Sequence, residues 1–162
     1  MKIIKQIVLV MVLATFASCG PTKVVKQSKK TLKGYWSLDN VSYDRTGIFD
    51  VVLFEDVKSE CLVGSTWRFI PNNNFGNYEI TVPGCEAGKR YFVWGIPNND
   101  GTDTNYDILL KPTDEKMNST MNNQGFRVNL AYLSDEQLTM TQTINFEGKP
   151  FKIIMNFSRT AE

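Results

Sequence analysis

Two cysteines are the side chains of this sequence whose spacing points most directly to chemistry. Cys61 precedes a strand-like run, Cys85 follows the next one, and antiparallel pairing of the two runs would bring the cysteines together. Cysteine pairs in exported domains are usually bonded. The adjacent Glu60 and Glu86 would raise a thiol pKa and so oppose reactivity. We therefore predict a structural Cys61–Cys85 disulfide, with two reactive thiols as the alternative.

The sequence contains no histidine. Its absence excludes Ser-His-Asp and Cys-His nucleophile systems and argues against most zinc and copper sites. The carboxylate pairs at 114–115 and 135–136 stand in predicted turns, where solvated charges are expected rather than acid–base groups. Segment 98–107 is rich in oxygen ligands suited to Ca²⁺, but it lacks EF-hand spacing and has ordinary turn composition. We predict no catalytic residue, no metal and no cofactor; an enzyme using only carboxylates is the remaining enzymatic alternative.

The first 18 residues have the pattern of an export signal peptide. Lys2 and Lys5 form a charged start, and the apolar run that follows, 7–16, is too short to span a bilayer as a stable anchor. The small residues before Cys19, in Phe16-Ala17-Ser18-Cys19, resemble the lipobox of bacterial lipoproteins. This resemblance implies cleavage before Cys19 and lipidation of that residue. A plain secretory signal with an accidental cysteine is the alternative.

Lipidation would anchor the protein to a bacterial membrane. No acidic run of the kind that directs some lipoproteins to the cell surface follows Cys19. We therefore expect a position in the cell envelope, on the outer membrane and facing the periplasm.

Residues 19–31 carry four lysines, no acidic residue and no usable periodicity, which predicts a flexible lipidated tether. Its lysines could lie against anionic headgroups or form a merely soluble spacer. All 17 acidic residues lie beyond residue 31 and outnumber the basic residues there. A mildly acidic body is a poor nucleic-acid binder, so no such partner is expected.

From residue 32 to 162 the sequence predicts one all-β domain, because apolar and polar residues alternate with period 2. Eight runs connected by short turns favour an antiparallel up-and-down barrel, since closure removes the sheet edges; a two-sheet sandwich is the alternative. Segment 48–57 fits either a short helix or an irregular edge segment. Tyr132 and Phe146 are expected on the inward face. The predicted strands are 32–41, 62–70, 77–82, 90–96, 106–110, 126–132, 138–146 and 151–157.

The first strand carries Gly34-Tyr35-Trp36, which resembles the Gly-x-Trp signature of lipocalins, and Arg159 matches the lipocalin arginine that packs over that tryptophan. Segment 62–74, with Leu133-Ser-Asp-Glu-Gln-Leu-Thr-Met, is similar to the lipocalin-like domain of bacterial lipoproteins. The resemblance covers roughly residues 32–160. It implies that Trp36 and Arg159 form a cation–π pair that closes one end of the barrel.

The function that this reading predicts is binding of a small hydrophobic ligand in the barrel interior, without covalent chemistry. The inward side chains are bulky, so the interior could be an open cavity or a filled core. A filled core would favour the alternative, a protein-binding inhibitor or accessory module that contacts an envelope protein through loops 97–105 and 112–124. The predicted ligand-lining residues are Trp36, Trp67, Tyr78, Phe92, Trp94 and Phe126.

Overall fold

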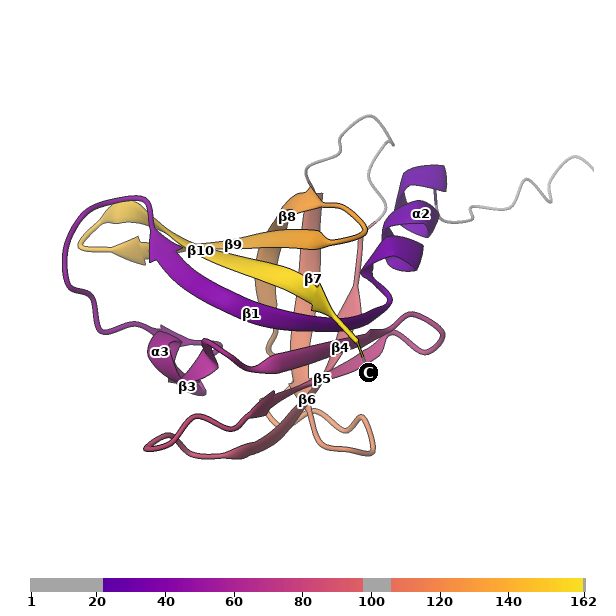
Figure 1. Cartoon of the computed structure of the whole chain (residues 1–162), viewed down its shortest axis with the longest axis horizontal. Helices are drawn as coiled ribbons and strands as arrows, with labels where there is room; N and C mark the ends of the chain where they lie inside the picture. The colour runs from indigo at the N-terminus through magenta and orange to yellow at the C-terminus, as the bar shows by residue number, and fades with distance from the viewer. Residues whose placement is uncertain (1–21, 98–105, 162) are drawn as a thin grey trace, which may run out of the picture.

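The computed structural model describes residues 22–97 and 106–161 (Figure 1). Eight antiparallel strands close into a barrel in the order β1-β10-β9-β8-β7-β6-β5-β4. Each strand pairs with its neighbour along the chain, and the first pairs with the last, so the topology is up-and-down as predicted. The strands are β1 (Gly34–Tyr43), β4 (Thr66–Ile70), β5 (Phe75–Ile80), β6 (Gly88–Gly95), β7 (Tyr106–Thr113), β8 (Phe126–Leu133), β9 (Gln137–Phe146) and β10 (Lys149–Thr160).

The alternating pattern places side chains as expected along most of the barrel. On β10 the predicted inward set is buried throughout, including Phe151 and Phe157, and on β6 Phe92 and Trp94 are buried. Period-2 alternation directs successive side chains to opposite faces of a strand, which explains this success.

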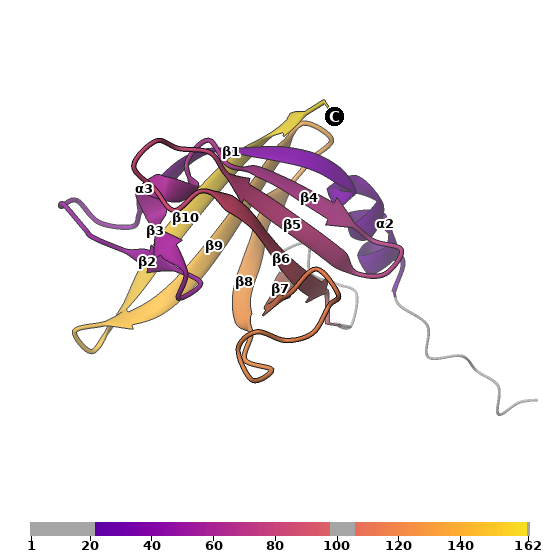
Figure 2. The same ribbon diagram turned by 90° about the horizontal axis from the view of Figure 1, so that it is seen from below.

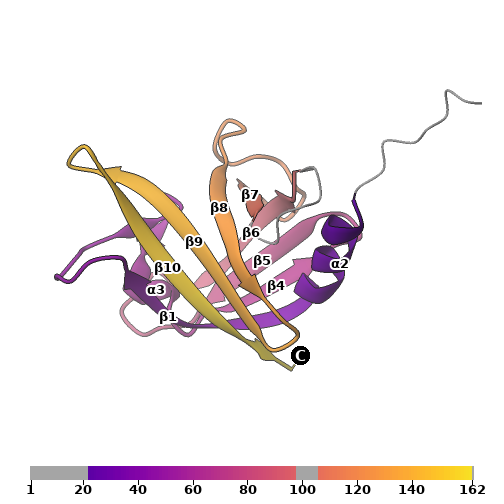
Figure 3. The ribbon, with the colours of Figure 1, turned by 90° about the horizontal axis from the view of Figure 1, so that it is seen from above.

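Two aromatic residues predicted to face inward are exposed instead. On β8 the pairing register shifts between Leu130 and Tyr132, and this irregularity leaves Tyr132 52% exposed. A bulge adds one residue to a strand and so reverses the face of the side chains beyond it. Phe146 is 41% exposed for a different reason: it lies at the tip of the β9–β10 hairpin, which projects past the rest of the barrel (Figure 3).

Residues 23–32 form a helix and not the predicted flexible tether. In α2 (Lys23–Leu32), Thr22 caps the first turn by accepting a hydrogen bond from the Val25 N–H, and Val25 and Leu32 are buried. Figures 1 and 2 show α2 at the opposite end of the barrel from the hairpin tip. A helix of this length is marginal alone, so its contacts with the barrel stabilise it. The signal peptide 1–18 and Cys19 lie outside the described residues.

Segment 48–57 is the irregular alternative, not a helix. It contains β2 (Val52–Leu53), which pairs with β3 (Val57–Lys58) in a small separate hairpin. The short helix α3 (Ser59–Leu62) follows and carries Cys61, whose disulfide to Cys85 is confirmed, with Cα atoms 5.7 Å apart. The disulfide links the segment between β3 and β4 to the β5–β6 loop.

Candidate functional site

One end of the barrel is closed by Arg159 and helix α2. The Arg159 guanidinium carbon lies 4.2 Å from the centre of the Trp36 ring, and its nitrogens donate hydrogen bonds to the carbonyls of Thr31, Lys33 and Asp135. The fully buried Trp36 indole donates to the Leu32 carbonyl at 2.9 Å. These contacts satisfy carbonyls at the C-terminus of α2, which have no partner inside the helix.

Gly34 makes room for this arrangement. Its φ of +113° is unfavourable for other residues, and a Cβ there would lie 3.1 Å from an Arg159 nitrogen. The Arg159 side chain therefore approaches the backbone closely at Gly34.

Aromatic rings fill the half of the barrel next to α2. Trp94 lies under Lys29 of the helix, with the ammonium 5.7 Å from the ring centre. Phe69 contacts Trp94 edge-on at 5.5 Å, and Trp67 stacks on Phe69 at 6.3 Å. All three rings are at most 3% exposed. This half of the interior is a filled core.

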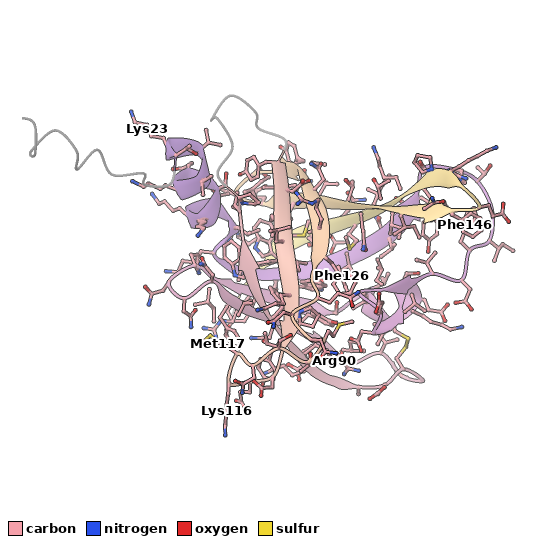
Figure 4. All side chains as sticks on the ribbon, turned by 180° about the vertical axis from the view of Figure 1, so that it is seen from behind. Lys23, Arg90, Lys116, Met117, Phe126 and Phe146 are labelled. Atoms are coloured by element: carbon pink, nitrogen blue, oxygen red, sulfur yellow. A yellow bond between two sulfur atoms is a disulfide. The ribbon has the colours of Figure 1, made fainter. Side chains whose placement is uncertain are left out.

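The other half contains a cavity of about 660 Å³ that opens at the end opposite α2, here called the mouth. Its walls come from β4 to β8, from the loops at 86–87 and 114–121, and from the tip of the β2–β3 hairpin. Trp67 forms its floor: this ring stacks on Tyr78 at 4.5 Å and contacts Phe92 at 5.7 Å. Figure 4 shows Arg90 and Phe126 on this side of the barrel, with Lys116 and Met117 projecting outward from the adjoining loop.

The cavity brings together four of the six predicted lining residues, namely Trp67, Tyr78, Phe92 and Phe126. Trp36 and Trp94 do not line it; they belong to the filled half. All six lie on strands and all but Phe126 are buried. Alternation indicates that a side chain faces inward, but it carries no information about depth along the barrel.

The tip of the β2–β3 hairpin covers part of the mouth. Phe54 is buried and contacts the rings of Trp67 at 5.9 Å and Phe126 at 5.5 Å. Phe54 and Glu55 have φ values of +56° and +53°, the left-handed conformation that non-glycine residues seldom adopt. The side chain of Gln124, in the β7–β8 loop, donates to Glu55 at 3.1 Å. The tip is thus held from both sides in a strained turn.

A polar network joins this tip to the barrel wall. The Tyr78 hydroxyl donates to Asp56 at 2.7 Å, and Arg90 donates to the same carboxylate oxygen at 3.2 Å. The pKa of Tyr78 is raised far above its ordinary value. Burial is the largest cause, and the hydrogen bond to Asp56 is the second. The phenol therefore stays neutral at physiological pH.

Carboxylates outnumber basic groups around the cavity. The two bases are Lys89 and Arg90, and Arg90 is engaged by Asp56 and lies 3.9 Å from Glu86. Hydrogen bonds from Asn118 hold the pKa of Asp114 below its usual value. The lining carboxylates are Glu55, Asp56, Glu86, Asp114 and Glu115.

Thr113 also belongs to the cavity lining. Its hydroxyl oxygen is buried and lacks a hydrogen-bond partner among residues 22–97 and 106–161. Buried hydroxyls are normally satisfied, so Thr113 leaves one hydrogen-bonding group of the cavity wall unsatisfied.

The sequence reasoning missed Phe54, Asp56, Arg90 and Thr113. The hairpin tip lacks the Asn-Gly or Asp-Gly pair that marks a two-residue turn, so no local signal indicated that Phe54 folds over the mouth. Arg90 and Thr113 come together with Asp56 only through the pairing of strands.

Two further features of the described residues bear on the type of site. No group of three or more Cys, Asp or Glu side chains suited to a metal ion occurs in residues 22–97 and 106–161. Neither helix of that part is long and apolar enough to cross a membrane. Most of the segment considered for Ca²⁺, 98–107, lies outside the described residues.

The fold and the site define a small closed antiparallel barrel with one plugged end and one cavity at its mouth. Among solved structures, the chain is similar to a lipocalin-like protein from Bacteroides uniformis. The two are 14% identical with a TM-score of 0.47, and the match covers 80% of this chain and 99% of that one. No protein-family model and no curated protein matches the chain.

Proposed function

We propose that this protein binds a small, largely apolar molecule in the cavity at the barrel mouth and catalyses no covalent step. The observation that carries the proposal is the 660 Å³ cavity with aromatic walls, set in a barrel whose other half is filled. Ligand sites in proteins have such volumes, with predominantly apolar walls and a few polar groups. Here the charged side chains around the cavity, among them Arg90, supply polar groups beside the rings.

The alternative, a protein-binding module, uses the loops at 97–105 and 112–124. In the described part, residues of the second loop such as Thr120 and Met121 form a wall of the cavity. A partner seated on this loop would therefore also cover the mouth. Such a partner would compete with a small ligand for the mouth.

A tryptophan-fluorescence screen with fatty acids, retinoids, haem and steroids tests the proposal, because Trp67 forms the cavity floor. We expect a saturable change for at least one class. Ala87→Trp, at an exposed position of the lining, should weaken that binding at least about tenfold by filling the mouth. Ala131→Trp, on the outside of β8, is the matched control and should not. Absence of saturable binding for every class would refute the proposal.

We also propose that Cys19 carries a lipid anchor that places the protein on the periplasmic face of a bacterial outer membrane. The lipobox-like Phe16-Ala17-Ser18-Cys19 supports this. Labelling of growing cells with a palmitate analogue should mark the protein, and Cys19→Ser should abolish the label and release the protein from the membrane fraction. Labelling that persists in Cys19→Ser would contradict it.

A further inference from the structure

The charges around the cavity indicate what kind of ligand it accepts, provided that it binds a small molecule as proposed above. Five carboxylates and two basic side chains line the cavity. The balance at the mouth is therefore negative. Complementary charge selects among ligands that have the same apolar body.

Both basic groups already have acidic partners. Arg90, whose side chain is 19% exposed, is engaged by Asp56 at 3.2 Å and lies 3.9 Å from Glu86. Lys89 lies 4.0 Å from Glu79, and Glu79 does not line the cavity. An anionic headgroup that binds Arg90 would have to displace Asp56, whereas the more exposed Lys89 makes only this long contact.

Asp114, at the start of the β7–β8 loop, is held in the ionised form. Asp114 accepts hydrogen bonds from the Asn118 backbone and side chain, both at 2.8 Å, and from the Lys116 backbone at 2.9 Å. The adjacent Glu115 is exposed and has no basic partner among the ion pairs of the described residues. Asp114 therefore keeps its negative charge where the cavity opens, with Lys116 of the same loop as the nearby cation.

The walls offer a second attraction for a cation. Trp67, Tyr78, Phe92 and Phe126 line the cavity, and Phe54 covers it. The faces of aromatic rings attract organic cations, and groups of rings bind quaternary ammonium ions in other proteins. Thr113, a residue that is 5% exposed, adds a buried hydroxyl without a hydrogen-bond partner among the described residues to the same wall.

We infer that the ligand is an organic cation, in which an ammonium group is joined to an apolar body. The aromatic cavity, the engaged bases and the surplus of carboxylates all favour such a molecule over a fatty acid or another anion.

The test compares three probes that share one eight-carbon chain: octyltrimethylammonium, 1-octanol and octanoate, each below its micelle-forming concentration. Titration calorimetry and tryptophan fluorescence would give the affinities for the disulfide-bonded protein. We expect the cation to bind at least about tenfold more tightly than the anion, with the alcohol between them. Added salt should reduce this preference without abolishing it, because ring contacts are less screened than the exposed carboxylates.

Charge variants locate the effect. Glu86→Gln with Glu115→Gln removes two exposed charges from the mouth and should weaken cation binding at least threefold while leaving 1-octanol unchanged. Glu136→Gln with Glu147→Gln removes two exposed charges away from the cavity. This pair should change neither the affinity for the cation nor the affinity for 1-octanol. Equal weakening by both pairs would refute local recognition of the cation.

The outcomes separate this inference from the function on which it rests. Saturable binding with octanoate equal to or tighter than the cation would overturn the inference and leave the ligand-binding function standing. If none of the three probes and no compound of the wider screen binds saturably, the function itself is refuted.

Discussion

Arg159→Ala should destabilise the protein and release helix α2 from the barrel. Arg159 contributes a cation–π contact with Trp36 and charged hydrogen bonds to three backbone carbonyls. Charged hydrogen bonds contribute about 1.5–3 kcal/mol each when buried, and a cation–π contact about 0.5–2 kcal/mol. Because Arg159 is half-buried and water can replace part of these contacts, we expect a total loss of about 2–3 kcal/mol.

Urea unfolding followed by far-UV circular dichroism measures the free energy of unfolding, and amide exchange reports on α2 separately. The last turn of α2 should lose protection, because Arg159 satisfies carbonyls there. Arg159→Lys keeps the charge but not the planar fork and should recover less than half of the loss.

The control is Arg127→Ala on the barrel exterior. Arg127 forms an ion pair with Asp107 at 2.6 Å, but its side chain is 64% exposed. Exposed pairs contribute about 0–1 kcal/mol. An Arg159→Ala loss no greater than that of Arg127→Ala, or unchanged exchange in α2, would refute the role assigned to Arg159.

Three further predictions concern the mouth. Replacing Cys61 and Cys85 together by alanine should lower the free energy of unfolding by about 3.5 kcal/mol, because the disulfide restricts a long loop in the unfolded chain; urea unfolding with and without reductant checks this. Glu55→Gly relieves a positive φ, which is worth about 0.5–1 kcal/mol, but loses the hydrogen bond from Gln124, so the net change in thermal unfolding should be below about 0.5 kcal/mol. Tyr78→Phe should cost about 1–2 kcal/mol at pH 7 in urea unfolding, since it leaves Asp56 without its phenol donor.

The pH dependence of Tyr78 follows from its raised pKa. Below the ordinary value of 10.0 both folded and unfolded forms are protonated, and the contribution of the neutral phenol is complete. As the pH rises above 10.0, the unfolded chain loses this proton first, so the stability falls. The difference in stability between the protein and Tyr78→Phe should therefore shrink between about pH 10 and 11.5. A difference that stays constant over this range would contradict a raised pKa.

Helix α2 shows how a segment without a strong local signal becomes ordered. Val25 and Leu32 are the buried residues of the helix, and they are separated by a lysine-rich stretch that indicates a solvated tether. The partners that stabilise the helix, including Arg159 and Asn74, come from far along the chain. Local periodicity cannot report contacts of this kind.

The exposed Tyr132 shows a second limit. Alternation along 126–132 predicts that it faces inward, and Val128 and Leu130 follow that rule. An irregularity after Leu130 then changes the register. A single extra residue in one strand has no signature in a pattern of apolar and polar residues, because it depends on how the neighbouring strand pairs.

The sequence by itself determined the parts of the protein that depend on local chemistry and short-range pattern. Period-2 alternation predicted eight strands and most of their inward-facing residues. The short turns between the strands predicted an antiparallel meander. The positions of Cys61 and Cys85 around one strand pair predicted their bond.

Only the tertiary structure decided where the barrel interior is filled and where it is hollow. Trp94 on β6 and Trp67 on β4 both face inward, yet Trp94 lies within the filled half, whereas Trp67 at its edge forms the floor of the cavity. The physical reason is that alternation sets the direction of a side chain, whereas the stagger of paired strands sets its depth. The placement of Phe54 over the mouth likewise depends on contacts between segments far apart in the chain.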